Sequence, residues 1–228
     1  ENLDRGNYVA SQMIPAVCPC CKQPTQIRAS EPDKEGKIIK VLYCDNEACD
    51  SRKLKKFEHF VSKKAMDIEG LAGSTLEKLI GRGLLHSVTD IYTLDKYREE
   101  IVRMEGFGEK SWQKLWDAIQ KSRNTTFERF LISMDIPMIG NDASRALAAE
   151  FHNSLSEFID AVYSQYDFTK LPNFGNTLHG NIYDWFSVEE NHCLWYELQE
   201  LVSIQKPSET APAAEGSPFA NKTIVVTG

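Results

Sequence analysis

The stretch Cys18-Pro19-Cys20-Cys21, followed by Cys44-Asp45-Asn46-Glu47-Ala48-Cys49, decides the fold of the first quarter of this chain. The spacing of Cys18 and Cys21 lets both thiolates turn toward one centre, and Cys44 and Cys49 complete a tetrahedral four-sulfur shell. The pattern therefore predicts one structural Zn²⁺ ion. Two disulfides are the alternative interpretation, but they require an oxidising compartment, and the sequence shows no signal peptide and no apolar membrane span.

Two further cysteines do not fit this quartet. Cys20 is excluded because directly adjacent cysteines cannot easily chelate one ion, and Cys193 is expected to be a small buried side chain within a helix. Between the two pairs, the alternating run at residues 37–43 predicts a strand of a hairpin that returns the chain to the metal.

The composition is that of a soluble globular protein, with 228 residues, of which 42% are hydrophobic and 26% charged. The net charge of -7 is unevenly distributed, because residues 150–228 carry 11 acidic and 3 basic side chains (-8) and residues 1–149 therefore sum to +1. Within the first part six cations gather with only Glu58 opposing them: Arg52, Lys53, Lys55, Lys56, Lys63 and Lys64. This cluster suits contact with phosphates, although a solvated charged face fits the charge pattern equally well.

Helix signals dominate the rest of the chain. Four capping boxes, each a hydroxyl followed three residues later by a glutamate, predict helix starts: Ser74 with Glu77, Thr125 with Glu128, Ser154 with Glu157, and Ser187 with Glu190. Apolar side chains then recur at helical spacing, and short strands are expected only near the cysteines and at residues 222–226. The predicted fold is mainly α: a small four-cysteine zinc-binding module followed by a helical domain.

Glycine-bearing turns recur about every 35 residues between the predicted helices. They read Gly70-Leu71-Ala72-Gly73, Gly106-Phe107-Gly108, Met138-Ile139-Gly140 and Asn173-Phe174-Gly175. A helix that opens directly after such a turn leaves its first amides free to bind an anion such as phosphate. The turns therefore resemble the helix-hairpin-helix DNA-binding motif, whose contacts position a protein on DNA without reading bases. The alternative is a zinc-stabilised helical repeat that acts as a protein-interaction scaffold, in which the glycines only end helices.

The residues expected to contact DNA are the turn glycines and cations near them. They are Gly70, Gly73, Gly106, Gly108, Gly140, Gly175, Lys63, Lys64, Lys110 and Arg145. Two turns depart from the motif, since Ala72 displaces the second glycine of the first turn and Asn173 replaces a glycine in the fourth. The second and third turns are therefore expected to make the strongest contacts.

Four further motifs follow the cysteine pairs in order. They are His59-Phe60-Val61-Ser62-Lys63-Lys64-Ala65-Met66-Asp67-Ile68-Glu69-Gly70-Leu71, Glu105-Gly106-Phe107-Gly108-Glu109-Lys110-Ser111, Ile136-Pro137-Met138-Ile139-Gly140, and Phe219-Ala220-Asn221-Lys222-Thr223-Ile224-Val225-Val226-Thr227-Gly228. Together with the cysteine pairs, they resemble the C-terminal half of bacterial NAD-dependent DNA ligase. The last motif resembles the opening strand of that family's BRCT domain.

The resemblance implies the DNA-binding, nick-clamping part of a ligase. In that family a lysine in a K-x-D-G motif takes AMP from NAD, and Lys34-Glu35-Gly36 lacks the aspartate. NAD and Mg²⁺ are therefore expected only in domains that this sequence lacks, and the fragment by itself is expected to be inactive. The implied partners are nicked duplex DNA and the missing N-terminal adenylation and OB-fold domains, with no membrane. The implied setting is replication and repair at the nucleoid in the bacterial cytoplasm.

The same resemblance implies a division into five parts. Residues 1–15 are a leader expected to be the end of an OB-fold, 16–55 a four-cysteine zinc finger, and 56–204 a helix-hairpin-helix domain. Residues 205–218 are expected to be a flexible linker because they contain few apolar groups, and 219–228 a truncated first BRCT strand.

Overall fold

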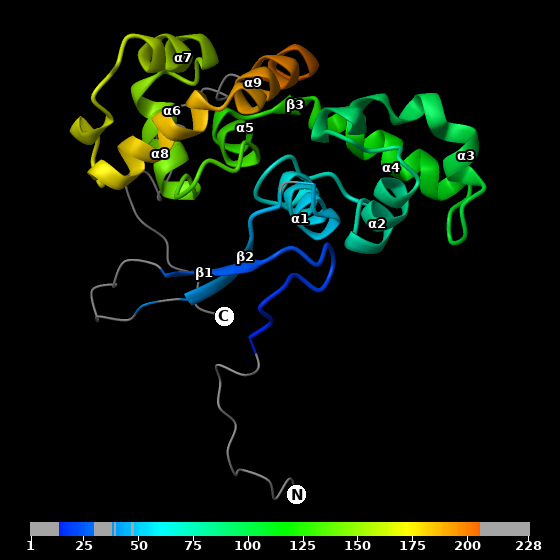
Figure 1. Ribbon diagram of the computed structural model, residues 1–228. Helices are drawn as coiled ribbons and strands as arrows, with labels where there is room; N and C mark the ends of the chain where they lie inside the picture. The colour runs from blue at the N-terminus through cyan, green and yellow to red at the C-terminus, as the bar shows by residue number, and fades with distance from the viewer. Residues whose placement is uncertain (1–13, 30–37, 39, 47, 206–228) are drawn as a thin grey trace, which may run out of the picture.

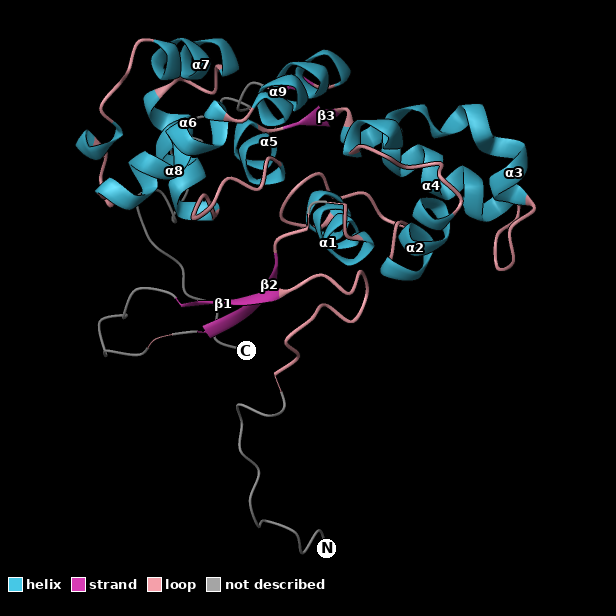
Figure 2. Ribbon diagram, in the orientation of Figure 1, coloured by secondary structure: helices cyan, strands magenta, loops and turns pink. Residues whose placement is uncertain are grey.

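The computed structural model describes residues 14–29, 38, 40–46 and 48–205. The mainly α fold is confirmed (Figures 1 and 2). The helices are α1 (Asp50–Val61), α2 (Gly73–Gly81), α3 (Arg98–Val102), α4 (Glu109–Ser122), α5 (Phe127–Ser133), α6 (Asn141–Glu150), α7 (Leu155–Tyr163), α8 (Asn176–Ser187) and α9 (Glu189–Leu201), with 3-10 helices η2 (Val88–Tyr97) and η3 (Phe168–Lys170). The strands are β1 (Thr25–Ala29), β2 (Lys40–Cys44), β3 (Asn124–Thr125) and β4 (Ser203–Ile204). Most of the predicted leader and linker and the whole predicted BRCT strand lie outside the described residues.

The cysteine-bearing segment is built on an antiparallel hairpin, β1–β2, in which Thr25 pairs with Cys44 and Ala29 with Lys40. The predicted strand at residues 37–43 is confirmed over residues 40–43, and β2 extends to Cys44. Apolar side chains on this hairpin remain exposed, among them Ile27 and Val41, so little hydrophobic burial holds it together. We call the described residues between 14 and 49 the four-cysteine module.

One continuous core of buried apolar side chains runs from α1 to α9. Its centre is aromatic: Trp195 is fully buried and packs edge-on against Phe130, with ring centroids 5.0 Å apart. In Figure 1, α2, α3 and α4 lie at one end of the helical domain and α6, α7 and α8 at the other, with α1, α5 and α9 between them. The glycine-bearing turns connect helices that share this core.

Two sets of polar contacts join elements of the domain that lie far apart in the sequence. Arg123 donates to the carbonyl oxygens of Leu201 at 3.0 Å and Tyr92 at 2.9 Å, beside the parallel pair β3–β4. His59 Nε2 hydrogen-bonds the carbonyl oxygen of Ile132 at 2.7 Å and so joins α1 to α5. His59 therefore has a structural contact within the helical domain.

The predicted helix start at Ser154 is confirmed, although the Glu157 carboxylate bonds His152 and does not complete a capping box, and the other three predicted starts are corrected. Ser154 caps α7 as predicted, accepting from the Glu157 amide at 3.2 Å. The cap of α5 is Thr126 rather than Thr125, which lies in β3. The predictions at Ser74 and Ser187 were wrong: each lies inside a helix, while Ala72 and Val188 are the N-caps of α2 and α9.

The structure has one capping box that the sequence analysis did not predict, and one cysteine whose predicted burial is wrong. Ser87 and Asp90 form a reciprocal capping box at η2, with an aspartate in place of the usual glutamate. Cys193 is exposed on α9, so the prediction of a buried side chain was wrong. The helix turns Leu194 and Trp195 inward instead.

Candidate metal centre and nucleic-acid interface

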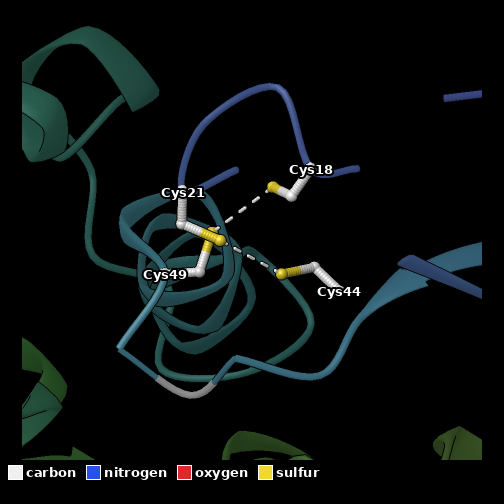
Figure 3. Close-up of side chains that lie close together, drawn as sticks. All are labelled: Cys18, Cys21, Cys44 and Cys49. Atoms are coloured by element: carbon white, nitrogen blue, oxygen red, sulfur yellow. Dashed lines mark hydrogen bonds between the residues drawn. The ribbon is translucent and has the colours of Figure 1, made fainter. Parts of the chain in front are cut away.

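The four predicted ligands converge on one point at the start of α1 (Figure 3). The sulfurs of Cys18 and Cys49 are 3.7 Å apart, those of Cys21 and Cys44 are 3.5 Å apart, and all four lie within 4.8 Å of one another. Metal–sulfur bonds of about 2.3 Å in a tetrahedron place the sulfurs roughly 3.8 Å apart, whereas a disulfide needs about 2 Å. The thiols are free, so the quartet fits a four-thiolate metal ion and not two disulfides.

Local backbone structure aims these sulfurs. A tight knuckle closes on the first pair: the Lys22 amide donates to the Cys18 carbonyl at 2.9 Å, and Lys22 itself takes a φ of 60°. Cys44 ends β2, and Cys49 is the fully buried N-cap of α1. Backbone amides at the start of α1 favour a thiolate at that position, but desolvation and the neighbouring thiols leave the pKa of Cys49 raised.

The thiols of the quartet differ in their acid–base properties. Hydrogen bonds from the Asn46 side chain and the Gln23 backbone lower the pKa of Cys21 to about 6. Desolvation raises the pKa of Cys44 to about 12. A bound metal ion would hold Cys44 as a thiolate and release its proton. Cys20 is exposed and stands outside the quartet, as expected.

The four glycine-bearing turns share one backbone form, and each precedes a helix. We call them turn 1 (residues 70–72), turn 2 (106–108), turn 3 (138–140) and turn 4 (173–175). The first residue of each turn is left-handed. The φ values are 95° for Gly70, 82° for Gly106, 68° for Met138 and 65° for Asn173. The second is apolar and packs against the core, as Leu71 and Ile139 do. The third is the extended N-cap of α2, α4, α6 or α8.

The helices after these turns start without a side-chain cap. Within the described residues no acceptor is recorded for the first three amides of α4, α6 or α8. By contrast, Thr126 and Ser154 cap α5 and α7. Because uncapped amides carry the positive end of the helix dipole, the turns present anion-binding groups to solvent.

Three of the turn glycines are not explained by the fold itself. Gly108, Gly140 and Gly175 have extended backbones, and a Cβ added to any of them would meet nothing within 4 Å. Turn 1 differs, because Ala72 takes the N-cap position and a Cβ on Gly73 would lie 2.8 Å from the Glu58 carboxylate. The open space at turns 2, 3 and 4 leaves room for a close external ligand.

Comparison with known proteins shows which proteins the chain is similar to. No protein-family model matches it. It is 34% identical over all 228 residues to the DNA ligase of Lachnoclostridium phytofermentans and 33% identical over the same length to that of Ruminiclostridium cellulolyticum. The DNA ligase of Acinetobacter baylyi is 36% identical over 218 residues, 94% of the chain.

The chain is homologous to one segment of these DNA ligases. It spans about one third of the length of these curated relatives, 33%, 33% and 30% respectively. None of the helices in the described part of the ligase segment is long and apolar enough to cross a membrane.

The predicted cationic contacts of the ligase segment differ in their availability. Lys63, Lys64 and Lys110 are exposed, and none has an ion pair among the described residues. Arg145 shares its guanidinium with Asp142, at 3.6 Å, on the first turns of α6. Glu109 at the start of α4 is paired with Arg98 at 2.7 Å, so its carboxylate is partly neutralised there.

Sequence reasoning missed two features of this surface. Glu58 lies beside the start of α2, although it is 12 residues before turn 1, because α1 packs against α2. Met138 is left-handed although it is not a glycine, so its own residue type did not predict this conformation. The proline before it, which favours the second position of a turn, was the available signal.

Proposed function

We propose that this segment grips duplex DNA at a nick for an NAD-dependent DNA ligase that seals single-strand breaks in replication and repair. Its relatives are DNA ligases, and the segment matches only part of each. NAD, Mg²⁺ and the adenylating lysine would belong to the adenylation and OB-fold domains, so the segment alone would bind DNA without joining it. The site of action would be the nucleoid in the bacterial cytoplasm.

The observation that carries this proposal is the open start of α4, α6 and α8. Each has free amides, a glycine N-cap and empty space where a side chain would stand. Backbone amides with no side chain in the way can approach a phosphate closely, and the helix dipole favours its charge. The three turns are therefore proposed as helix-hairpin-helix contacts, with Lys63, Lys64, Lys110 and Arg145 as additional cations.

Contacts of this type would not depend on base sequence. Amides and lysines that reach phosphates fix the position of a protein on the duplex but read no base edges. Binding would weaken as salt rises, because each neutralised phosphate releases counterions. The acidic balance of residues 150–228 does not oppose such binding, since the amides act locally at the turns.

Zinc is proposed as the ion of the four-cysteine module, with Cys18, Cys21, Cys44 and Cys49 as its ligands. Four thiolates in a tetrahedron are typical of structural zinc sites. The ion would fix the start of α1, whose N-cap is Cys49, and so join the module to the helical domain. In the proposed division into a zinc finger (16–55) and a helix-hairpin-helix domain (56–204), α1 is shared by both parts. Residues 1–15, 205–218 and 219–228 remain proposals as a leader, a linker and a BRCT strand.

The proposal is tested by measuring binding to a nicked duplex at two salt concentrations. Gly108→Asp and Gly140→Asp place a carboxylate among the free amides and should each weaken binding about tenfold. Ser156→Asp is the matched control: it adds the same charge near the start of α7, which Ser154 already caps, and should leave the affinity unchanged. Equal affinity in all four proteins would remove the turns from the interface. No binding by the wild type at low salt would favour a protein-interaction scaffold.

A further inference from the structure

Two side chains reach from one turn-helix unit to the turn of another. Lys78 of α2 donates from Nζ to the carbonyl oxygen of Glu105 at 2.9 Å, and Asn181 of α8 donates from Nδ2 to the carbonyl oxygen of Pro137 at 3.0 Å. Glu105 immediately precedes left-handed Gly106, and Pro137 immediately precedes left-handed Met138. The two bonds therefore hold the same position in turns 2 and 3.

The donors are equivalent as well. α2 begins at Gly73 and α8 at Asn176, so Lys78 and Asn181 are each the sixth residue of the helix that follows a turn. The helix after turn 1 thus holds turn 2, and the helix after turn 4 holds turn 3. A donor of this kind recurs on both sides of the domain although one is a lysine and the other an asparagine.

The held carbonyl controls the shape of the turn. In residues 104–107 and 136–139 the fourth amide bonds the first carbonyl, at 2.9 and 3.0 Å, and the third residue has positive φ, as a type II turn requires. The peptide unit between the second and third residues is the one whose orientation distinguishes type I from type II. A donor on the carbonyl oxygen of this peptide unit fixes its orientation. The type II orientation requires a positive φ at the third residue, which is unfavourable for Met138 because it is not glycine.

The orientation of these turns sets the direction of the free amides. Gly108 lies two residues after Gly106 and is the N-cap of α4. Gly140 likewise lies two residues after Met138 and is the N-cap of α6. We infer that Lys78 and Asn181 are positioning residues that hold turns 2 and 3 in the form in which the first amides of α4 and α6 can bind phosphate. This inference rests on the proposed function, and it assigns Lys78 to a turn rather than to a phosphate.

The test is a pair of crossed mutant cycles, with affinity for a nicked duplex as the readout. Asn181→Ala should weaken binding about fivefold in the wild type and in Gly108→Asp, and should have no further effect in Gly140→Asp, whose turn 3 contact is already lost. Lys78→Met should weaken binding in the wild type and in Gly140→Asp, and should have no further effect in Gly108→Asp. Lys78→Arg should retain affinity because it keeps the donor. A general loss of stability would weaken binding equally in both backgrounds, and that result would overturn the inference.

Two further measurements separate this inference from failure of the proposed function. Asn191→Ala removes another side-chain bond to a backbone carbonyl, from Asn191 Nδ2 to Trp185 at 3.0 Å, and should leave affinity unchanged. The salt dependence of binding should keep its slope in Asn181→Ala, since no cation is removed. If the wild type does not bind DNA, the proposed function fails. Amide NMR shifts then decide the positioning role: changes confined to residues 137–140 in Asn181→Ala support it, and unchanged shifts there refute it.

Discussion

Helices in this molecule begin in two contrasting ways. α5 and α7 satisfy their own first amides, through Thr126 and Ser154, whereas α4, α6 and α8 begin at glycines and leave those amides open. α3 and α9 also begin without a side-chain cap, at Tyr97 and Val188, so the feature specific to the turns is the glycine at the N-cap. A protein that can cap its helices, and does so at α7, gains no stability from leaving others uncapped. The open starts are therefore the helix ends at which the proposed phosphate contacts can be tested.

α1 is a third case that sharpens the contrast. Its N-cap, Cys49, makes no side-chain hydrogen bond to the helix, yet it is fully buried among the other three sulfurs. The positive end of α1 is thus covered by the cluster of four cysteines instead of by a hydroxyl or an external anion. The predictions below change one type of start at a time.

Loss of the metal should have the largest effect, and it should be local. Removing zinc with a chelator, or making Cys44→Ser, should unfold the four-cysteine module and fray the start of α1, because zinc–thiolate binding contributes on the order of 10 kcal/mol and the exposed hairpin has little apolar core to replace it. Hydrogen exchange should show lost protection in β1 and β2 and native protection in α5 to α9.

Cys20→Ser is the control for that experiment. Cys20 lies outside the quartet, so this variant should retain one zinc ion per chain and normal exchange. Uniform loss of protection through the helical domain in Cys44→Ser would contradict a local role for the metal.

Capping an open start should separate stability from binding. In Gly108→Asp and Gly140→Asp the carboxylate can accept from the free amides, so the free energy of unfolding should be unchanged or rise by up to about 1 kcal/mol while DNA affinity falls about tenfold. Thermal melts and binding isotherms on the same protein check this. Parallel losses of stability and affinity would mean that the glycines serve the fold.

Removing a cap should have the opposite result. Ser154→Ala deprives the Glu157 amide of its acceptor and should lower the free energy of unfolding by about 1 kcal/mol, with no change in DNA affinity. Denaturant titration gives the first quantity and fluorescence anisotropy the second. A clear loss of affinity would show that α7 belongs to the binding surface.

The smallest effect is expected at turn 1. Glu58→Gln removes the carboxylate beside Gly73 and should raise DNA affinity by less than about threefold, since the group is paired with Lys55 at 2.6 Å near the surface. Anisotropy at low salt is sensitive enough to detect it. Weaker binding in this variant would indicate that Glu58 supports turn 1 instead of repelling phosphate.

The sequence predicted features that are encoded locally. Cysteine spacing identified all four members of the quartet, and apolar periodicity identified the helical domain. Helix starts were less certain, because Thr125 and Thr126 both offer a hydroxyl before the same apolar run. The exposure of Cys193 depends on which face of α9 meets the core, which periodicity did not resolve. The Lys78 and Asn181 bonds join residues 27 and 44 positions apart, and only the packed helices bring those together.

The empty space around Gly108, Gly140 and Gly175 also has an evolutionary consequence. Selection for folding alone should tolerate alanine, serine or aspartate at these positions, so glycine there should persist only while the external ligand is bound. A lineage that lost the ligand should accumulate substitutions at these sites before its core changed. Turn 1, with Ala72 at the equivalent position and Glu58 nearby, has the form expected of a turn already released from that constraint.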